Sequence, residues 1–134
     1  MAWFEAAIRS VRRAGAQGCG NAKSPQKPRM ILVDGGPLVA IADADDQHHS
    51  SCKTALASLR EPLGTVWPVL AEAMYLLTDL PDGQNALWEM IARGAVALLP
   101  LDFVDVPRIR ELMGKYSDRG MDLADAALIR VAER

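Results

Sequence analysis

Short apolar runs alternate with helix-like segments along the chain from residue 30 onwards. Three runs predict strands, and they cover residues 30–33, 64–67 and 95–99. A short, continuous apolar run is typical of a strand that is covered on both faces, as in a parallel sheet. The pattern therefore predicts three strands buried beneath helices.

The segments between these runs have the apolar spacing of helices that cover a core. Pro68 and Pro107 stand where a proline fits the first turn of a helix, and Pro81-Asp82-Gly83 predicts a break between two helices. The predicted helices cover residues 37–42, 46–59, 69–77, 86–93, 107–116 and 122–133. Strands that alternate with helices predict an α/β domain with a parallel sheet.

The first 29 residues differ from the rest in charge and composition. Residues 2–13 predict a short amphipathic helix, and residues 14–29 are rich in Gly, Pro, Ser, Asn and Lys, which predicts a flexible linker. We therefore expect a basic N-terminal extension, residues 1–29, and one globular domain, residues 30–134. The extension is either an upstream addition without a role or a basic arm for RNA or a membrane surface. Its arginines follow its apolar residues, so it is not typical of a signal peptide.

Composition limits the partners of the globular domain. Residues 30–134 carry nine positive and sixteen negative side chains, a net charge of −7. An acidic domain cannot bind nucleic acid through bulk charge, so binding would need a metal ion, a local basic patch or a basic partner. No apolar run is long enough to predict a transmembrane helix. Cys19 and Cys52 have no metal-binding or redox spacing, which indicates reduced thiols and a cytoplasmic protein.

Three segments place acidic residues among apolar neighbours. They are Ile31-Leu32-Val33-Asp34, Val69-Leu70-Ala71-Glu72-Ala73-Met74 and Met121-Asp122-Leu123-Ala124-Asp125-Ala126. Carboxylates are rarely buried unless they are paired or hold a metal, so such acids require an explanation. If the three segments converge, the repulsion among their carboxylates calls for a cation, and oxygen ligands of this kind select Mg²⁺ or Mn²⁺. The sequence therefore predicts a metal site of the type that cleaves phosphodiesters.

Each acid also has a simpler explanation that the sequence leaves open. Asp34 precedes Gly35-Gly36-Pro37, and an Asp before such residues readily forms an Asx turn. The helix around Glu72 is apolar on nearly every face, which predicts a buried helix. Glu72 could nevertheless form a salt bridge or lie on an exposed stripe one residue wide. Asp122 and Asp125 are three residues apart, the spacing of a pair that caps a helix.

Other side chains are weaker candidates for catalysis. His48 and His49 are adjacent, so they do not share a helix face, and no partners for acid–base catalysis are evident near them. Trp67 and Trp88 are predicted to lie in the core rather than to stack on bases. The sequence has no Gly-x-Ser-x-Gly turn, P-loop or Gly-x-Gly-x-x-Gly motif.

Three motifs taken together resemble the PIN-domain ribonucleases, and among them the VapC-like toxins of bacterial toxin–antitoxin pairs. The motifs are Ile31-Leu32-Val33-Asp34-Gly35-Gly36-Pro37-Leu38-Val39-Ala40, Trp67-Pro68-Val69-Leu70-Ala71-Glu72-Ala73 and Met121-Asp122-Leu123-Ala124-Asp125-Ala126. The resemblance covers residues 30–134, and it depends on the order and spacing of all three motifs.

The resemblance implies a fold, a site and an activity. The fold is a PIN-like three-layer arrangement with a central parallel sheet flanked by helices. Asp34, Glu72 and Asp125 match the family's first three metal-binding acids, and Asp122 stands beside them as a supporting acid. The implied activity is Mg²⁺- or Mn²⁺-dependent endonucleolytic cleavage of RNA. The implied partners are a small antitoxin protein and a second copy of the chain in a homodimer.

The chain departs from the family in two places. Gly35 follows the first Asp where the family usually has a hydroxyl residue, so a hydrogen bond near the metal is predicted to be missing. The family continues into a further strand and a fourth acid, which would fall beyond Arg134, so we expect the C-terminal strand to be missing. The alternative function is a non-catalytic PIN-like module that binds RNA or a protein partner. A receiver-like domain is a weaker interpretation, because only Asp34 ends the first strand.

Overall fold

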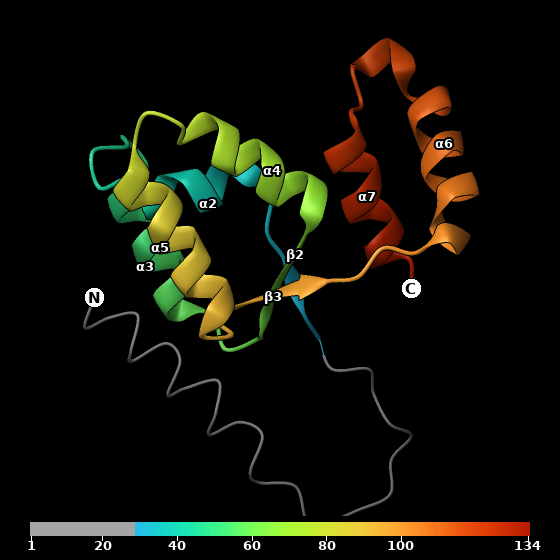
Figure 1. Cartoon of the computed structure of the whole chain (residues 1–134). Helices are drawn as coiled ribbons and strands as arrows, with labels where there is room; N and C mark the ends of the chain where they lie inside the picture. Colours follow the sequence, from blue (N-terminus) through green and yellow to red (C-terminus); the bar gives the residue numbers. More distant parts are fainter. Residues whose placement is uncertain (1–28) are drawn as a thin grey trace, which may run out of the picture.

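The three predicted strands form one parallel sheet. The computed structural model describes residues 29–134, and it contains β1 (Ile31–Leu32), β2 (Leu63–Val66) and β3 (Val96–Leu99), with β2 in the centre (Figure 1). In the register, Leu63 stands opposite both Ile31 and Val96. The helix predicted over residues 2–13 lies outside the described residues, as does the linker predicted over residues 14–29 apart from its last residue.

Helices cover the sheet on both sides (Figure 1). The described residues contain six α-helices: α2 (Gly35–Ala42), α3 (His49–Ser58), α4 (Trp67–Leu76), α5 (Pro81–Ala92), α6 (Val106–Lys115) and α7 (Leu123–Ala132). Two short 3₁₀ helices, η1 (Phe103–Asp105) and η2 (Ser117–Arg119), flank α6. The predicted α/β architecture with a central parallel sheet is confirmed.

The ends of β1 and β2 carry the chain directly into helices. The backbone N–H of Val33 donates to the carbonyl of Gly64 at 2.8 Å, and the fully buried hydroxyl of Thr65 donates to the carbonyl of Val33 at 2.9 Å. These bonds fix the end of β1 beside β2. The strand predicted over residues 64–67 ends at Val66, because Trp67 and Pro68 already belong to the first turn of α4.

Helix α5 begins earlier than predicted. Pro81-Asp82-Gly83 was expected to separate two helices, yet α5 begins at Pro81, where a proline costs no hydrogen bond. Gly83 is buried, and a Cβ at this position would come within 2.9 Å of Leu80 Cδ2 and 3.1 Å of Leu77 Cδ2. Gly83 therefore permits the close approach of two leucines and does not break the helix.

The core lies between the sheet and α2, α4, α5 and α7. Its buried side chains include Val33, Leu38, Ile41, Val66, Val69, Leu70, Ala73, Leu77, Leu87, Met90, Val96, Ala124 and Ala127. The prediction that the two tryptophans lie in this core is wrong: Trp67 is 56 % exposed and Trp88 is 48 % exposed. No helix of the described part is both long and apolar enough to cross a bilayer.

Candidate functional site

Asp34 stands at the junction of β1 and α2. It is the N-cap of α2, and its Oδ1 accepts a hydrogen bond from the backbone N–H of Gly35 at 2.7 Å. A side-chain oxygen at this position satisfies a helix donor that would otherwise lack a partner. The side chain is exposed, and its second oxygen is not used by this cap. Asp34 thus caps α2 through the next residue rather than through residue i+2 as in an Asx turn, and it stands at the strand end where ligands bind in open parallel sheets.

Glu72 lies on the exposed side of α4. The buried side of this helix is formed by Val69, Leu70 and Ala73, whereas Glu72 itself is exposed. The expectation that this helix is buried on nearly every face is wrong, because Tyr75 and other large apolar residues of α4 point to solvent. Glu72 therefore does not need a partner to compensate for deep burial.

The pKa of Glu72 is nevertheless raised above its ordinary value. The first cause is desolvation by the protein packed around the carboxyl, and the second is the negative charge of Asp122. The charges of Asp34 and Asp125 raise the pKa further, and so does a side-chain hydrogen bond with Asp122. Glu72 is thus close enough to the carboxylates of two other segments to be repelled by their negative charge.

Asp122 and Asp125 form a reciprocal cap at the start of α7. The N–H of Asp125 donates to Asp122 Oδ1 at 2.9 Å, and the N–H of Asp122 donates to Asp125 Oδ2 at 3.4 Å. Both side chains are exposed. The three-residue spacing of Asp122 and Asp125 therefore forms a capping box, the explanation that the sequence left open. Both carboxylates lie at the N-terminal end of α7.

Two substitutions of Asp122 should distinguish its capping of α7 from its repulsion of Glu72 as effects on stability. Asp122→Ala removes the acceptor for a helix N–H and should lower the free energy of unfolding by about 1 kcal/mol. Asp122→Asn keeps an acceptor oxygen and removes one of the charges that repel Glu72, so its stability should equal or exceed that of the wild type. Urea denaturation of both variants measures the difference. Equal destabilisation by Ala and Asn would contradict this role of the cap.

The fold brings the four predicted site residues to one end of the sheet. Asp34 follows β1, Glu72 lies on the helix that follows β2, and α4 packs against both α2 and α7. Figure 1 shows α4 between α2 and α7. The four acids are exposed, which corrects the premise that they lie buried among apolar neighbours. Some apolar neighbours, such as Val33, Leu70 and Ala124, are buried in the core, whereas Leu123 is half exposed and the carboxylates lie at the surface.

The donor set has the chemistry of a site for a hard divalent cation. Each carboxylate has two oxygens, and the caps that Asp34, Asp122 and Asp125 form use only one oxygen of each. A cation would also offset the repulsion that raises the pKa of Glu72. Among residues 29–134, no three Asp, Glu, His or Cys side chains are arranged to hold an ion as they stand. Completing such a site would therefore need side-chain rotation.

The two histidines lie elsewhere. The Nδ1 of His49 lies 2.8 Å from the carbonyl oxygen of Ala40, a bond that requires a hydrogen on Nδ1. His49 lines a cavity of about 430 Å³ together with residues of α2, α3 and α5, among them Lys53, Asp82 and Glu89. None of the four acids lines this cavity. His49 is thus separate from the acidic site.

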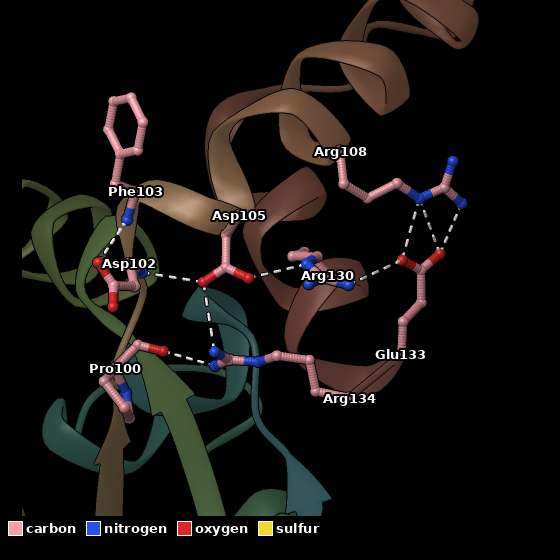
Figure 2. Close-up of polar contacts among 8 residues, drawn as sticks. All are labelled: Pro100, Asp102, Phe103, Asp105, Arg108, Arg130, Glu133 and Arg134. Atoms are coloured by element: carbon pink, nitrogen blue, oxygen red, sulfur yellow. Dashed lines mark hydrogen bonds and ion pairs between the residues drawn. The ribbon is translucent and has the colours of Figure 1, made fainter.

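The fully buried carboxylate of the domain is Asp105, which the sequence analysis did not select. Its Oδ1 accepts from Arg130 Nε at 2.8 Å, and its Oδ2 accepts from Arg134 Nη1 at 3.3 Å and from the backbone N–H of Asp102 at 2.9 Å (Figure 2). The spacing of Asp102 and Asp105 before Pro107 indicates a capping box, but no local signal gives the arginine partners.

The pairing of Asp105 bears on the basic residues near the third motif. From the sequence, Lys115, Arg119 and Arg130 could contact an RNA backbone, but solvation at the surface is the simpler expectation. Arg130 points instead to Asp105, so it is not available for a phosphate. Lys115 lies over the ring of Tyr116, with Nζ 5.2 Å from the ring centre, and its side chain and that of Arg119 remain at the surface.

Comparison with known proteins supports the fold. Residues 31–134 match the family model described as "PIN domain". Ribonuclease VapC26 of Mycobacterium tuberculosis is 26 % identical over 106 residues, which cover 78 % of each chain. The crystal structure of VapC20 of Mycobacterium tuberculosis, described as a sarcin-ricin loop cleaving toxin, superposes with a TM-score of 0.69. It is 19 % identical and covers 78 % of this chain and 82 % of that one, a likeness that concerns the fold alone.

Proposed function

Because this chain belongs to the PIN domain family, we propose that it is a metal-dependent endoribonuclease, the toxin component of a type II toxin–antitoxin system. In this proposal, Asp34, Glu72, Asp122 and Asp125 hold the metal, and Asp34, Glu72 and Asp125 are the catalytic acids. The substrate is RNA, and the bond that breaks is a phosphodiester.

One observation supports this proposal most strongly. Desolvation raises the pKa of Glu72, and carboxylates from two other segments raise it further: Asp34 lies 38 positions before Glu72, and Asp122, with its neighbour Asp125, begins 50 positions after it. Such a concentration of negative charge costs free energy at neutral pH, and nearby cationic side chains do not appear among the causes of this pKa shift. A divalent cation would offset the repulsion, and carboxylate oxygens are the ligands that Mg²⁺ and Mn²⁺ prefer.

The four carboxylates have separate tasks in this proposal. Asp34 and Asp122 are held in place by the N–H groups of Gly35 and Asp125, so their free oxygens start from fixed positions. Glu72 serves as a ligand in its deprotonated form, and its raised pKa means that metal binding should weaken as the pH falls. When bound, a divalent ion would supply Lewis-acid activation of water and charge neutralisation at the phosphate. No protein nucleophile is then needed.

The acidic character of the domain fits this mechanism. With a net charge of −7 over residues 30–134, the domain repels RNA in the absence of a cation. RNA binding should therefore depend on Mg²⁺ or Mn²⁺ more strongly than it depends on lysine and arginine contacts. Lys115 and Arg119, both at the surface, are the candidates for auxiliary contacts near the acids.

The purified chain tests the proposal directly. We expect RNA cleavage in Mn²⁺ or Mg²⁺, loss of cleavage with a chelator, and Mn²⁺ binding by calorimetry that requires Asp34. Asp34→Asn is the sharpest variant, because Asn keeps the oxygen that caps α2 and removes only the charge. Equal Mn²⁺ affinity in the wild type and Asp34→Asn would refute the metal site.

A second function has support from the caps themselves. Asp34, Asp122 and Asp125 all serve as capping residues, so their positions are explained without a metal. The alternative is a non-catalytic PIN-like module that binds RNA or a protein partner. This module would bind RNA or the partner equally well with chelator present, and it would leave the RNA intact. Cleavage in Mn²⁺ separates the two functions.

We further propose that the protein acts in the cytoplasm with two kinds of protein partner. One partner is a cognate antitoxin, and the other is a second copy of this chain. The exposed apolar side chains Trp67, Tyr75 and Leu76 on α4 support a protein contact on that helix. Sedimentation of the full chain at several concentrations tests the homodimer, and a single monomeric species throughout would contradict it.

A further inference from the structure

The most deeply buried side chains of the helix that carries two of the acids are small. They are Ala124, Ala126 and Ala127, whereas Leu128 and Val131 are only partly buried against the core, and the helix packs against α4, α6 and β2. Alanine methyl groups give a shallow surface that does not interlock with a neighbouring helix as larger side chains do. The alanines therefore provide burial, but they do little to fix how far α7 slides or rotates along α4.

The two elements that must meet at the acids are attached to the sheet differently. The helix of Glu72, α4, follows β2 without a loop, so its position is fixed by the sheet. By contrast, twenty-three residues, including η1, α6 and η2, separate the end of β3 from the start of α7. The chain connection alone thus leaves α7 free to shift relative to α4.

Ionic contacts join the C-terminal end of α7 to the segment that follows β3. Asp105, fully buried and held by the N–H of Asp102 just after β3, accepts hydrogen bonds from Arg130 and Arg134 (Figure 2). Arg134 also donates to the carbonyl of Pro100, the residue that follows β3, at 2.6 Å. Both arginines lie at the C-terminal end of α7, so these contacts join that end directly to the end of β3.

We propose that Asp105 and Arg130 are positioning residues for the acidic site. Charged hydrogen bonds of defined geometry fix the position of a helix along its axis more strictly than apolar contacts do. Arg130 lies five residues after Asp125, about 7.5 Å along the helix at 1.5 Å per residue. A shift of α7 that breaks the Arg130–Asp105 pair therefore moves Asp122 and Asp125 by the same amount relative to Glu72. This inference rests on the proposed function of the four acids.

The test compares Mn²⁺ affinity and helix placement in three variants of the full chain. Asp105→Asn keeps the shape of the side chain and removes its charge. The double variant Asp105→Leu with Arg130→Met replaces the ion pair by apolar side chains. Such a replacement often preserves stability but removes the directional hydrogen bonds between the two residues. Met90→Ala is the matched control, because it destabilises the core beneath α5, away from α7. Calorimetry is performed where circular dichroism shows each variant folded, and methyl–methyl NOEs between the alanines of α4 and α7 report helix placement.

We expect Mn²⁺ affinity to fall by at least about tenfold in Asp105→Asn and in the double variant, as for other groups that orient ligands from outside the site. The NOEs between α4 and α7 should weaken in both. Met90→Ala should lower the melting temperature and leave the affinity and these NOEs unchanged. Unchanged affinity in the folded Asp105 variants, or an equal loss in Met90→Ala, would overturn the inference. If the wild type binds no Mn²⁺, the proposed function fails, and the NOEs alone then decide the positioning role: their loss in Asp105→Asn supports it, and unchanged NOEs refute it.

Discussion

Glu72→Gln is expected to reduce divalent-ion-dependent RNA cleavage by at least about a hundredfold and to leave the fold intact. The substitution removes one carboxylate from the metal ligands that we propose, and loss of a ligand costs at least as much as loss of a group that supports one. The amide has the same shape as the carboxyl group, and Glu72 is exposed, so the core is not disturbed. Single-turnover cleavage of RNA in Mn²⁺ and Mn²⁺ calorimetry give the two measurements.

The same substitution should not destabilise the protein. The pKa of Glu72 is raised by desolvation and then by the charges of Asp122, Asp34 and Asp125. A carboxyl group with a raised pKa in the folded state lowers stability at pH values above that pKa, and this penalty disappears as the pH falls through it. At neutral pH, Glu72→Gln should therefore be at least as stable as the wild type.

Glu61→Gln provides the matched control for Glu72→Gln. Glu61 precedes β2 and thus lies at the opposite end of this strand from α4 and its glutamate. Cleavage and Mn²⁺ affinity should be unchanged in this variant. Full cleavage by Glu72→Gln, or equal losses in both variants, would exclude a special role for Glu72.

The largest expected effect on stability belongs to Asp105→Asn. Asp105 is fully buried and accepts three hydrogen bonds, two of them from arginines. Removal of its charge deprives Arg130 and Arg134 of the buried carboxylate that both contact, and breaking a buried ion pair is strongly destabilising. We expect the melting temperature to fall by on the order of 10 °C. Glu111→Gln, which breaks the exposed contact with Arg108, should change it by about 2 °C or less.

The loss of stability caused by Asp105→Asn should depend on pH in a defined direction. The pKa of Asp105 is lowered, first by the hydrogen bond from the N–H of Asp102 and then by Arg130 and Arg134, which together outweigh burial. A carboxyl with a lowered pKa stabilises the fold at pH values above its ordinary pKa, and this contribution is lost as the pH falls through the lowered value. The difference between wild type and variant should be constant near neutral pH and shrink below about pH 4. A difference that persists unchanged at low pH would show that charge is not its cause.

Features encoded in short segments were predicted well from the sequence. Apolar runs predicted all three strands to within two residues at each end, because a buried parallel strand needs a continuous apolar stretch. The proline positions predicted the starts of α4 and α6. The order of three acidic motifs predicted the family, which the match over residues 31–134 confirms. The roles of Asp34, Glu72, Asp122 and Asp125 in metal binding stay predictions.

The errors arose where distant parts of the chain decide the outcome. Trp67 and Trp88 are apolar, but their helices turn them to solvent, and composition alone does not say which side of a largely apolar helix is covered. Gly83 has the identity of a helix breaker, but it is needed for close packing against Leu77 and Leu80. Arg130 lies beside an acidic motif in the sequence, but its side chain reaches a different carboxylate.

The sequence by itself determined the strands, most of the helices, the caps and the family, because periodicity and capping depend on neighbours within a few residues. Only the tertiary structure decided which carboxylate is buried and which are exposed. Asp105 is separated from Arg130 by 25 residues and from Arg134 by 29, and the acids of the candidate site come from three separate segments. Contacts of this length depend on how the helices pack on the sheet, and no local pattern in the chain specifies them.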